Sequence, residues 1–144
     1  MKVILDTNFL VYCAKERLDY IEKIELLLPE NFEIVVPEQV IKELQRIIQK
    51  KKLRIPQIKR TPRFKKTTGR DKEASALAIQ LLEKYYKEEK IKIVKPVGRT
   101  VDEALIKLAQ EDKKNIVCTL DKEMRQKLGR VILLNKNKQL ILTK

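Results

Sequence analysis

The stretch that decides the fold is VILDTN, residues 3–8. It begins with a short β-branched apolar run, which predicts a buried strand, and Asp6 follows that strand directly. In a second stretch, VCTLD at residues 117–121, Asp121 follows another predicted strand by one residue. Functional sites in parallel sheets gather beyond the carboxyl ends of the strands. We therefore expect Asp6 and Asp121 at one edge of one sheet.

Predicted strands and helices alternate along the chain. Strands are predicted at residues 2–5, 32–36, 91–95 and 115–119, and 131–134 and 139–142 as a terminal hairpin or a strand with its edge partner. Helices are predicted at residues 9–28 in two pieces broken near 16–19, from Pro37 through 49, and at 71–87, 100–111 and 122–128. This order predicts right-handed crossovers and an α/β fold. The expected architecture is a three-layer α/β/α sandwich with a mainly parallel central sheet.

Charge is concentrated in one segment of a basic chain. The 144 residues carry a formal net charge of +13, and residues 50–70 hold ten Lys or Arg and no acid. We expect residues 1–144 to form one domain, with a basic loop at about 50–70. Charged residues are 37% of the sequence, above the roughly 25% usual in soluble domains. With few glycines, this composition resembles that of thermophile proteins.

Several classes of protein are excluded by what the sequence lacks. No histidine is present, which excludes a histidine acid–base pair, a Ser-His-Asp triad and His-ligated zinc. No apolar run approaches the roughly 20 residues of a membrane helix, and the start lacks a signal peptide's apolar stretch. We therefore expect a cytoplasmic protein with no membrane partner. Cys13 and Cys118 have no metal-ligand spacing and are predicted to be small buried hydrophobes.

Acidic residues stand where strands end or within helices that follow them. They are Asp6, Glu43, Asp102, Glu103 and Asp121. Each has a structural explanation: the aspartates 6 and 121 can cap the elements that follow, Thr100 and Glu103 have the spacing of a capping box, and Glu43 can be a solvated helix residue. If these residues meet, their mutual repulsion favours a bound cation, and oxygen ligands suit Mg²⁺ or Mn²⁺.

The order of these motifs resembles that of the PIN domain, a family of small α/β nucleases. The resemblance rests on VILDTN at 3–8, VVP at 35–37 followed by VIKEL at 40–44, TVDEALI at 100–106 and TLD at 119–121, and it spans residues 1 to about 134. It implies a metal-dependent endoribonuclease. The implied catalytic residues are Asp6, Glu43, Asp102 and Asp121. The implied ligands of Mg²⁺ or Mn²⁺ are Asp6, Asp102, Glu103 and Asp121.

Two positions depart from the family pattern. The family often has Asn or Asp before the fourth acid, where this chain has Leu120, so a polar group is lost from the edge of the site. The third motif offers both Asp102 and Glu103; we favour Asp102 as the ligand, because the capping box competes for Glu103. Supporting hydrogen bonds to ligands or metal-bound waters are predicted from Thr7, Asn8 and Thr119. The alternative is that these three are polar residues of turns and strand ends.

The basic segment is predicted to bind RNA through its phosphates, with Phe64 stacking on an unpaired base. The predicted RNA-binding residues are Lys50, Lys51, Lys52, Arg54, Lys59, Arg60, Arg63, Phe64, Lys65, Lys66 and Arg70. A solvated basic loop in a charge-rich protein is the alternative interpretation.

The resemblance implies two biological settings. One is the toxin of a VapBC-type pair, usually a homodimer inhibited by an antitoxin that occupies the site. The other is a ribosomal-RNA-processing nuclease with a ribosome-assembly partner. The basic segment slightly favours RNA processing. A different class of function is a catalytically inactive PIN module that binds RNA as a structural component of a larger particle. The retained acids argue against that alternative, and Leu120 argues mildly for it.

Overall fold

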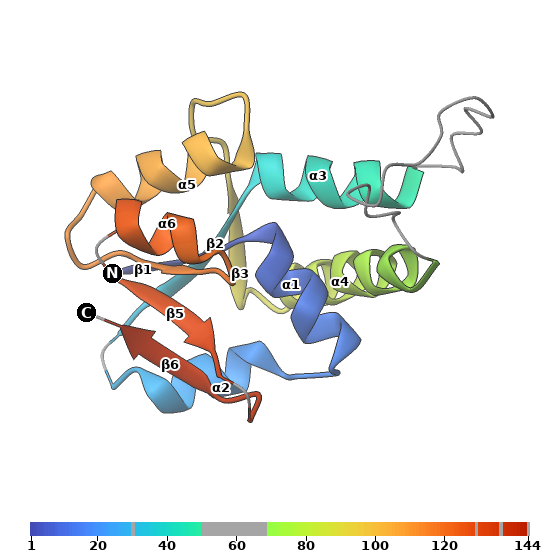
Figure 1. Ribbon diagram of the computed structural model, residues 1–144, viewed down its shortest axis with the longest axis horizontal. Coiled ribbons are helices and arrows are strands. Elements are labelled where there is room, and N and C mark those ends of the chain that lie inside the picture. Colours follow the sequence, from blue (N-terminus) through green and yellow to red (C-terminus); the bar gives the residue numbers. More distant parts are fainter. Residues whose placement is uncertain (30, 50–68, 129, 136, 144) are drawn as a thin grey trace.

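A computed structural model describes residues 1–29, 31–49, 69–128, 130–135 and 137–143. The helices are α1 (Thr7–Lys15), α2 (Tyr20–Leu27), α3 (Glu38–Gln49), α4 (Gly69–Lys87), α5 (Val101–Gln110) and α6 (Lys122–Lys127). The strands are β1 (Lys2–Leu5), β2 (Glu33–Pro37), β3 (Ile91–Val94), β4 (Ile116–Cys118), β5 (Val131–Leu134) and β6 (Leu140–Thr143). Figure 1 shows how they follow one another.

The six strands form one mostly parallel sheet in the order β3-β2-β1-β4-β5-β6. Only β6, at one edge, runs antiparallel, and it pairs with β5. The first strand lies between β2 and β4, so the chain builds outward in one direction and then returns to build in the other. The backbone N–H of Asp6 donates to the carbonyl of Cys118 at 3.0 Å, which extends the β1–β4 ladder to the end of β1. The strand order therefore reverses beside Asp6, where α/β sheets place their sites.

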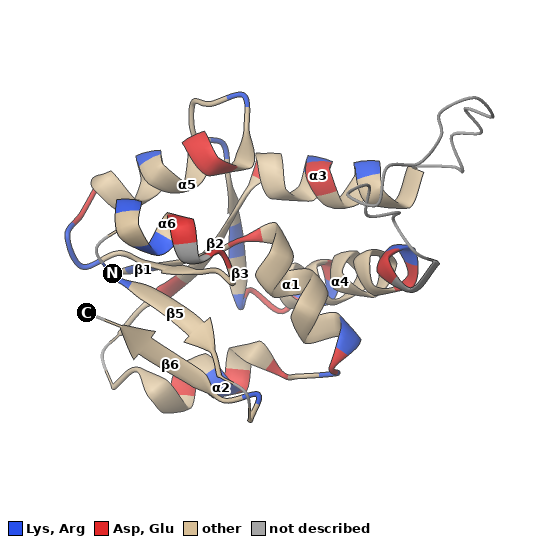
Figure 2. Cartoon of the chain, in the orientation of Figure 1, with Lys and Arg blue, Asp and Glu red and all other residues tan. Residues whose placement is uncertain are grey.

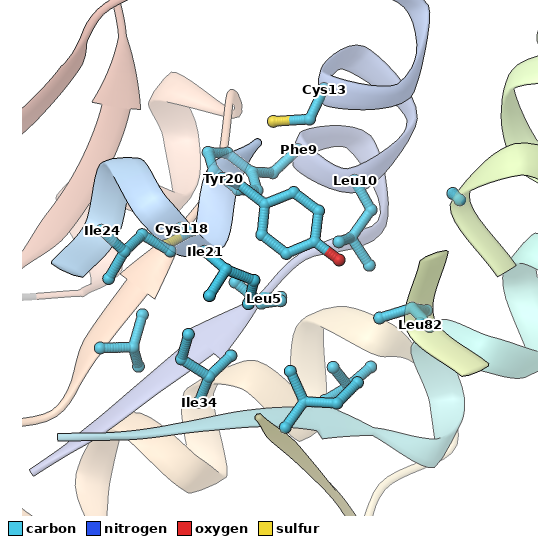
Figure 3. Close-up of a cluster of buried hydrophobic side chains, with 14 of the residues drawn as sticks. Leu5, Phe9, Leu10, Cys13, Tyr20, Ile21, Ile24, Ile34, Leu82 and Cys118 are labelled. Carbon is cyan, nitrogen blue, oxygen red and sulfur yellow. The ribbon is translucent and has the colours of Figure 1, made fainter. Parts of the chain in front are cut away.

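Successive side chains of the central strands pack alternately into two apolar layers, one on each face of the sheet. Val3 and Leu5 of β1 point to one face, where they pack with residues of α1, α2, α3 and α4. Figure 3 shows part of this layer, and Phe9, Leu10 and Tyr20 are among its side chains. Ile4 points to the other face and packs with residues of α5 and α6. The period of two along β1 thus covers the sheet on both sides, which confirms the expected α/β/α sandwich.

The predicted alternation of elements is confirmed, with shifts at their ends. The break within residues 9–28 separates α1 from α2, and the terminal strands form the expected antiparallel pair. Pro37 was expected in the first turn of a helix, but it is the last residue of β2 and pairs with Val94, and α3 begins at Glu38. A proline lacks only the N–H donor, so the end of a strand accepts it. The predicted basic loop falls on residues outside the described part of the chain, except for the start of α4.

The two cysteines are free and buried, as expected for small hydrophobes. Burial raises the pKa of the Cys13 thiol to about 12, so this thiol stays neutral. Among the described residues, no helix has both the length and the apolar character to cross a membrane.

Candidate active site

Asp6 is the buried centre of the site. It is the N-cap of α1, and its Oδ1 accepts a hydrogen bond of 2.7 Å from the backbone N–H of Thr7. Its Oδ2 accepts another of 2.7 Å from the Thr119 hydroxyl, which stands at the end of β4. The side chain is thereby fixed by the first residue of α1 and by the residue that follows β4. A carboxylate held this firmly cannot turn away from its neighbours.

The pKa of Asp6 is raised from 3.8 to about 6. Burial is the largest cause, because the charged form loses its hydration. The hydrogen bonds from Thr119 and Thr7 oppose this rise, and the charges of Glu43 and Asp102 add to it. Two acids from distant parts of the sequence therefore act electrostatically on Asp6, which means that all three share one region.

Three polar residues connect the acids. The Thr7 hydroxyl donates to Oε2 of Glu43 at 3.0 Å and so ties α1 to α3. The Asn8 Oδ1 accepts from the backbone N–H of Leu120 at 3.2 Å. Thr119, besides donating to Asp6, accepts from the backbone N–H of Asp121 at 3.1 Å. Each residue predicted to support the site thus makes a hydrogen bond to a predicted catalytic acid or to the loop that carries one.

These elements enclose a cleft of about 450 Å³. Figure 2 shows acidic positions at the start of α1, within α3, at the start of α5 and at the start of α6, on the side where these elements approach one another. The residues lining the cleft are Asp6, Thr7, Asn8, Val11, Tyr12, Lys15, Glu43, Ile47, Asp71, Ser75, Val101, Asp102, Leu120 and Asp121. All four residues predicted to be catalytic are among them.

Glu103 is the predicted metal ligand that does not line the cleft. Its backbone N–H donates to the Thr100 hydroxyl at 3.2 Å, and its carboxylate accepts from the backbone N–H of Arg99 at 2.9 Å. It therefore stabilises the start of α5, as the capping spacing indicated. Its neighbour Asp102 reaches the cleft instead. The choice between these two acids follows from the helix: consecutive residues point about 100° apart.

The donors of the cleft suit a hard divalent cation. The carboxylates of Asp6, Glu43, Asp71, Asp102 and Asp121 line it, and Lys15 is the one basic residue among its described lining. Burial first, and then the charges of Glu43 and Asp102, raise the pKa of Asp6, and a bound cation would offset both effects. Within the described residues, no three acids stand close enough together to form a ready-made metal site.

Sequence reasoning missed one end of the cleft. Asp71 and Ser75 of α4, with Lys15 of α1, line it but were not predicted to be site residues. The Lys15 ammonium forms an ion pair with the Asp71 carboxylate. The signal was the spacing of Asp71 and Ser75, which puts both on one face of α4. Only the packing of α4 against α1 shows which way that face points.

Comparison with known proteins finds a family, a curated relative and solved structures that resemble this chain. The family model of a PIN-like domain matches residues 3–137. Ribonuclease VapC4 of Methanocaldococcus jannaschii is 32% identical over 127 residues, which cover 88% of this chain and 82% of that protein. The chain therefore belongs to the PIN-like domain family.

Two solved structures share the fold. One is the PIN domain endonuclease Utp24, with a TM-score of 0.61 and 18% identity, covering 96% of this chain and 90% of that one. The other is VapBC2 from Rickettsia felis bound to a DNA fragment from its promoter, with a TM-score of 0.53 and 17% identity, covering 89% of this chain and 96% of that one. At these identities the likeness concerns the fold.

Proposed function

We propose that this chain is an endoribonuclease that hydrolyses RNA phosphodiester bonds in the acidic cleft, with Mg²⁺ or Mn²⁺ as cofactor. The observation that carries the proposal is the convergence of Asp6, Glu43, Asp102 and Asp121 on one cleft beyond the ends of β1 and β4. The 32% identical relative, a ribonuclease, supports RNA as the substrate.

The residues have distinct parts in this proposal. A bound divalent ion supplies a water of lowered pKa and offsets the charge that grows on the phosphate. Asp6, Asp102 and Asp121 would hold the ion, and the Thr119 hydroxyl keeps Asp6 oriented through its 2.7 Å hydrogen bond. To the Glu43 carboxylate, which accepts a hydrogen bond from Thr7 at 3.0 Å, we assign the acceptance of a proton from the attacking water. Leu120 contributes its backbone N–H to Asn8 at 3.2 Å.

We further propose that this nuclease works in a VapC-type setting, with an antitoxin as its protein partner. The curated relative at 32% identity is a VapC ribonuclease, whereas the likeness to Utp24 at 18% identity concerns the fold. This reverses the slight preference for RNA processing that the basic segment suggested. In this VapC-type setting we also propose that two copies of the chain form a homodimer.

Paired substitutions in α5 test the assignment of the acids. We expect Asp102→Asn to lower kcat/KM for RNA by about 100-fold, because it removes a charge that lines the cleft. Glu103→Gln should change kcat/KM by less than about threefold, since a glutamine oxygen still accepts the Arg99 N–H bond. The two changes remove the same charge from adjacent positions of one helix. Cleavage of a labelled single-stranded RNA under initial-rate conditions measures both.

Two results would count against this assignment. Equal activity of Asp102→Asn and the unmodified protein would remove Asp102 from the site. Failure of the unmodified protein to cut any RNA with Mn²⁺, while it still binds RNA, would favour the inactive RNA-binding module instead.

The basic segment is expected to bind substrate without taking part in the chemistry. Lys50, Lys51, Lys52, Lys65 and Lys66 lie outside the described residues, so this prediction rests on charge alone. Replacing all five with glutamine should flatten the log–log salt dependence of RNA binding by about 3.5, at roughly 0.7 per phosphate contact. The rate at saturating RNA should change little. An unchanged salt slope would show that the segment does not touch RNA, and would redirect attention to a protein partner.

A further inference from the structure

The cleft is longer than the group of predicted catalytic acids. Along α1 it is lined by Asn8, Val11, Tyr12 and Lys15, which recur at helical spacing on one face. At 1.5 Å per residue, Lys15 lies about 10 Å beyond Asn8 along the helix axis. The cleft thus has an acidic end beside Asp6 and a second end beside Lys15.

The second end differs in chemistry from the first. Ile47 of α3 gives it an apolar wall opposite α1. Its polar groups are the Lys15–Asp71 ion pair, whose side chains are 29% and 30% exposed, and Ser75. Lys15 is the one cation among the described residues that line the cleft. Among the described lining residues, a polyanion entering this acidic cleft meets its one cation here, and that cation is held by Asp71.

Ser75 independently points to a ligand. Its side chain is fully buried, it lines the cleft, and its hydroxyl has no hydrogen-bond partner among the described residues. Buried hydroxyls are nearly always paired, because an unpaired one loses its hydration without replacement. A polar group of a bound molecule would satisfy this hydroxyl once it turns from its closed-off position toward the cleft. Ion pairing between two helices explains Lys15 and Asp71 structurally, but it does not explain Ser75.

We propose that this second end is a subsite for the nucleotide next to the scissile phosphate. The Lys15 ammonium binds the phosphate of that nucleotide, Ser75 donates a hydrogen bond to its sugar or base, and Val11 and Ile47 contact its apolar surface. Asp71 holds the ammonium in place and is not a metal ligand. This inference rests on the proposed function, because it assumes that RNA occupies the acidic end.

Opposite signs of effect distinguish the subsite from a structural ion pair. Lys15→Gln should raise KM for RNA about tenfold, the loss of one charge-assisted contact, and flatten the salt slope by about 0.7, with kcat nearly unchanged. Asp71→Asn should lower KM, because it removes a negative charge beside the bound phosphate while its amide oxygen still accepts a hydrogen bond from Lys15. If the ion pair only held α1 against α4, both variants would lose that contact and both would bind RNA more weakly.

Ser75→Ala gives a second signature. It should raise Tm, because it removes an unpaired buried hydroxyl and places a better helix former within α4. It should also raise KM about threefold, since the substrate loses a hydrogen bond. A residue with only a structural role would not improve stability and impair binding together.

The experiment measures KM, kcat and Tm with Mn²⁺ and one single-stranded RNA, and the Kd of the same RNA in EDTA. Lys15→Arg keeps the charge and should bind as the unmodified protein does. Lys2→Gln is the control, because it breaks an exposed 3.2 Å ion pair with Glu111 at the start of β1, away from the cleft. Unchanged KM and Kd in Lys15→Gln, or weaker binding in both Lys15→Gln and Asp71→Asn, would overturn the subsite. RNA binding with the expected signs but no cleavage would overturn the proposed function and leave the subsite standing.

Discussion

Replacing Asp6 with asparagine is expected to lower kcat/KM for RNA by about 1,000-fold or more. The change removes the buried carboxylate that two hydrogen bonds fix at the centre of the acidic cleft. Asparagine keeps the size and can keep the bond from Thr7, so the fold should remain intact. Initial rates on a labelled single-stranded RNA with Mn²⁺ measure the loss. Asp112→Asn, at an exposed aspartate beyond α5, is the matched control and should cut at the normal rate.

The same substitution should stabilise the metal-free protein near neutral pH. Because the folded protein raises the pKa of Asp6 from 3.8 to about 6, the folded state binds the proton more tightly than the unfolded chain. The contribution of protonated Asp6 to the free energy of unfolding is fully present below pH 3.8 and is lost as the pH rises through about 6. In EDTA at pH 7, Asp6→Asn should therefore raise the free energy of unfolding by on the order of 2 kcal/mol, while at pH 3 it should change little. Urea unfolding at both pH values measures this. Equal effects at pH 3 and pH 7 would show that Asp6 carries no burial cost.

Removing divalent ions is expected to abolish cleavage altogether. The described lining of the cleft holds five acids and one lysine, so without a cation it repels phosphate and lacks a means to activate water. Protein treated with EDTA and then freed of chelator should be inactive, and Mg²⁺ or Mn²⁺ should restore its rate. Undiminished cleavage after chelation would require a mechanism that carboxylates, hydroxyls and lysines perform alone.

The sequence was sufficient for the sheet, because each strand is marked by its own apolar run. It was also sufficient to bring Asp6 and Asp121 together, since both follow neighbouring parallel strands. Helix capping and a place in the cleft do not exclude one another at these two residues. Asp6 caps α1, Asp121 accepts a hydrogen bond from the backbone N–H of Glu123 at 2.9 Å, and both line the cleft. A helix N-terminus favours a carboxylate, so one position serves both roles.

The rest depended on tertiary packing. Asp71 and Ser75 reach the cleft because α4 lies against α1, and no local pattern fixes that contact. The 3.0 Å hydrogen bond between Thr7 and Glu43 likewise depends on how α3 crosses the end of β1. Pro37 was misplaced by one element because a strand end and the first turn of a helix both tolerate a missing N–H. Such choices are made by contacts between residues distant in sequence.

The most direct test of the acidic cleft as a metal site is a calorimetric titration of Mn²⁺ into metal-free protein. We expect saturable binding to the unmodified chain, at least about tenfold weaker binding to Asp6→Asn and Asp121→Asn, and unchanged binding to Glu103→Gln. The first two variants remove charges that line the cleft, and the third removes one that does not. Equal binding by all four proteins, or no binding by the unmodified chain, would contradict the claim that these carboxylates hold the catalytic ion.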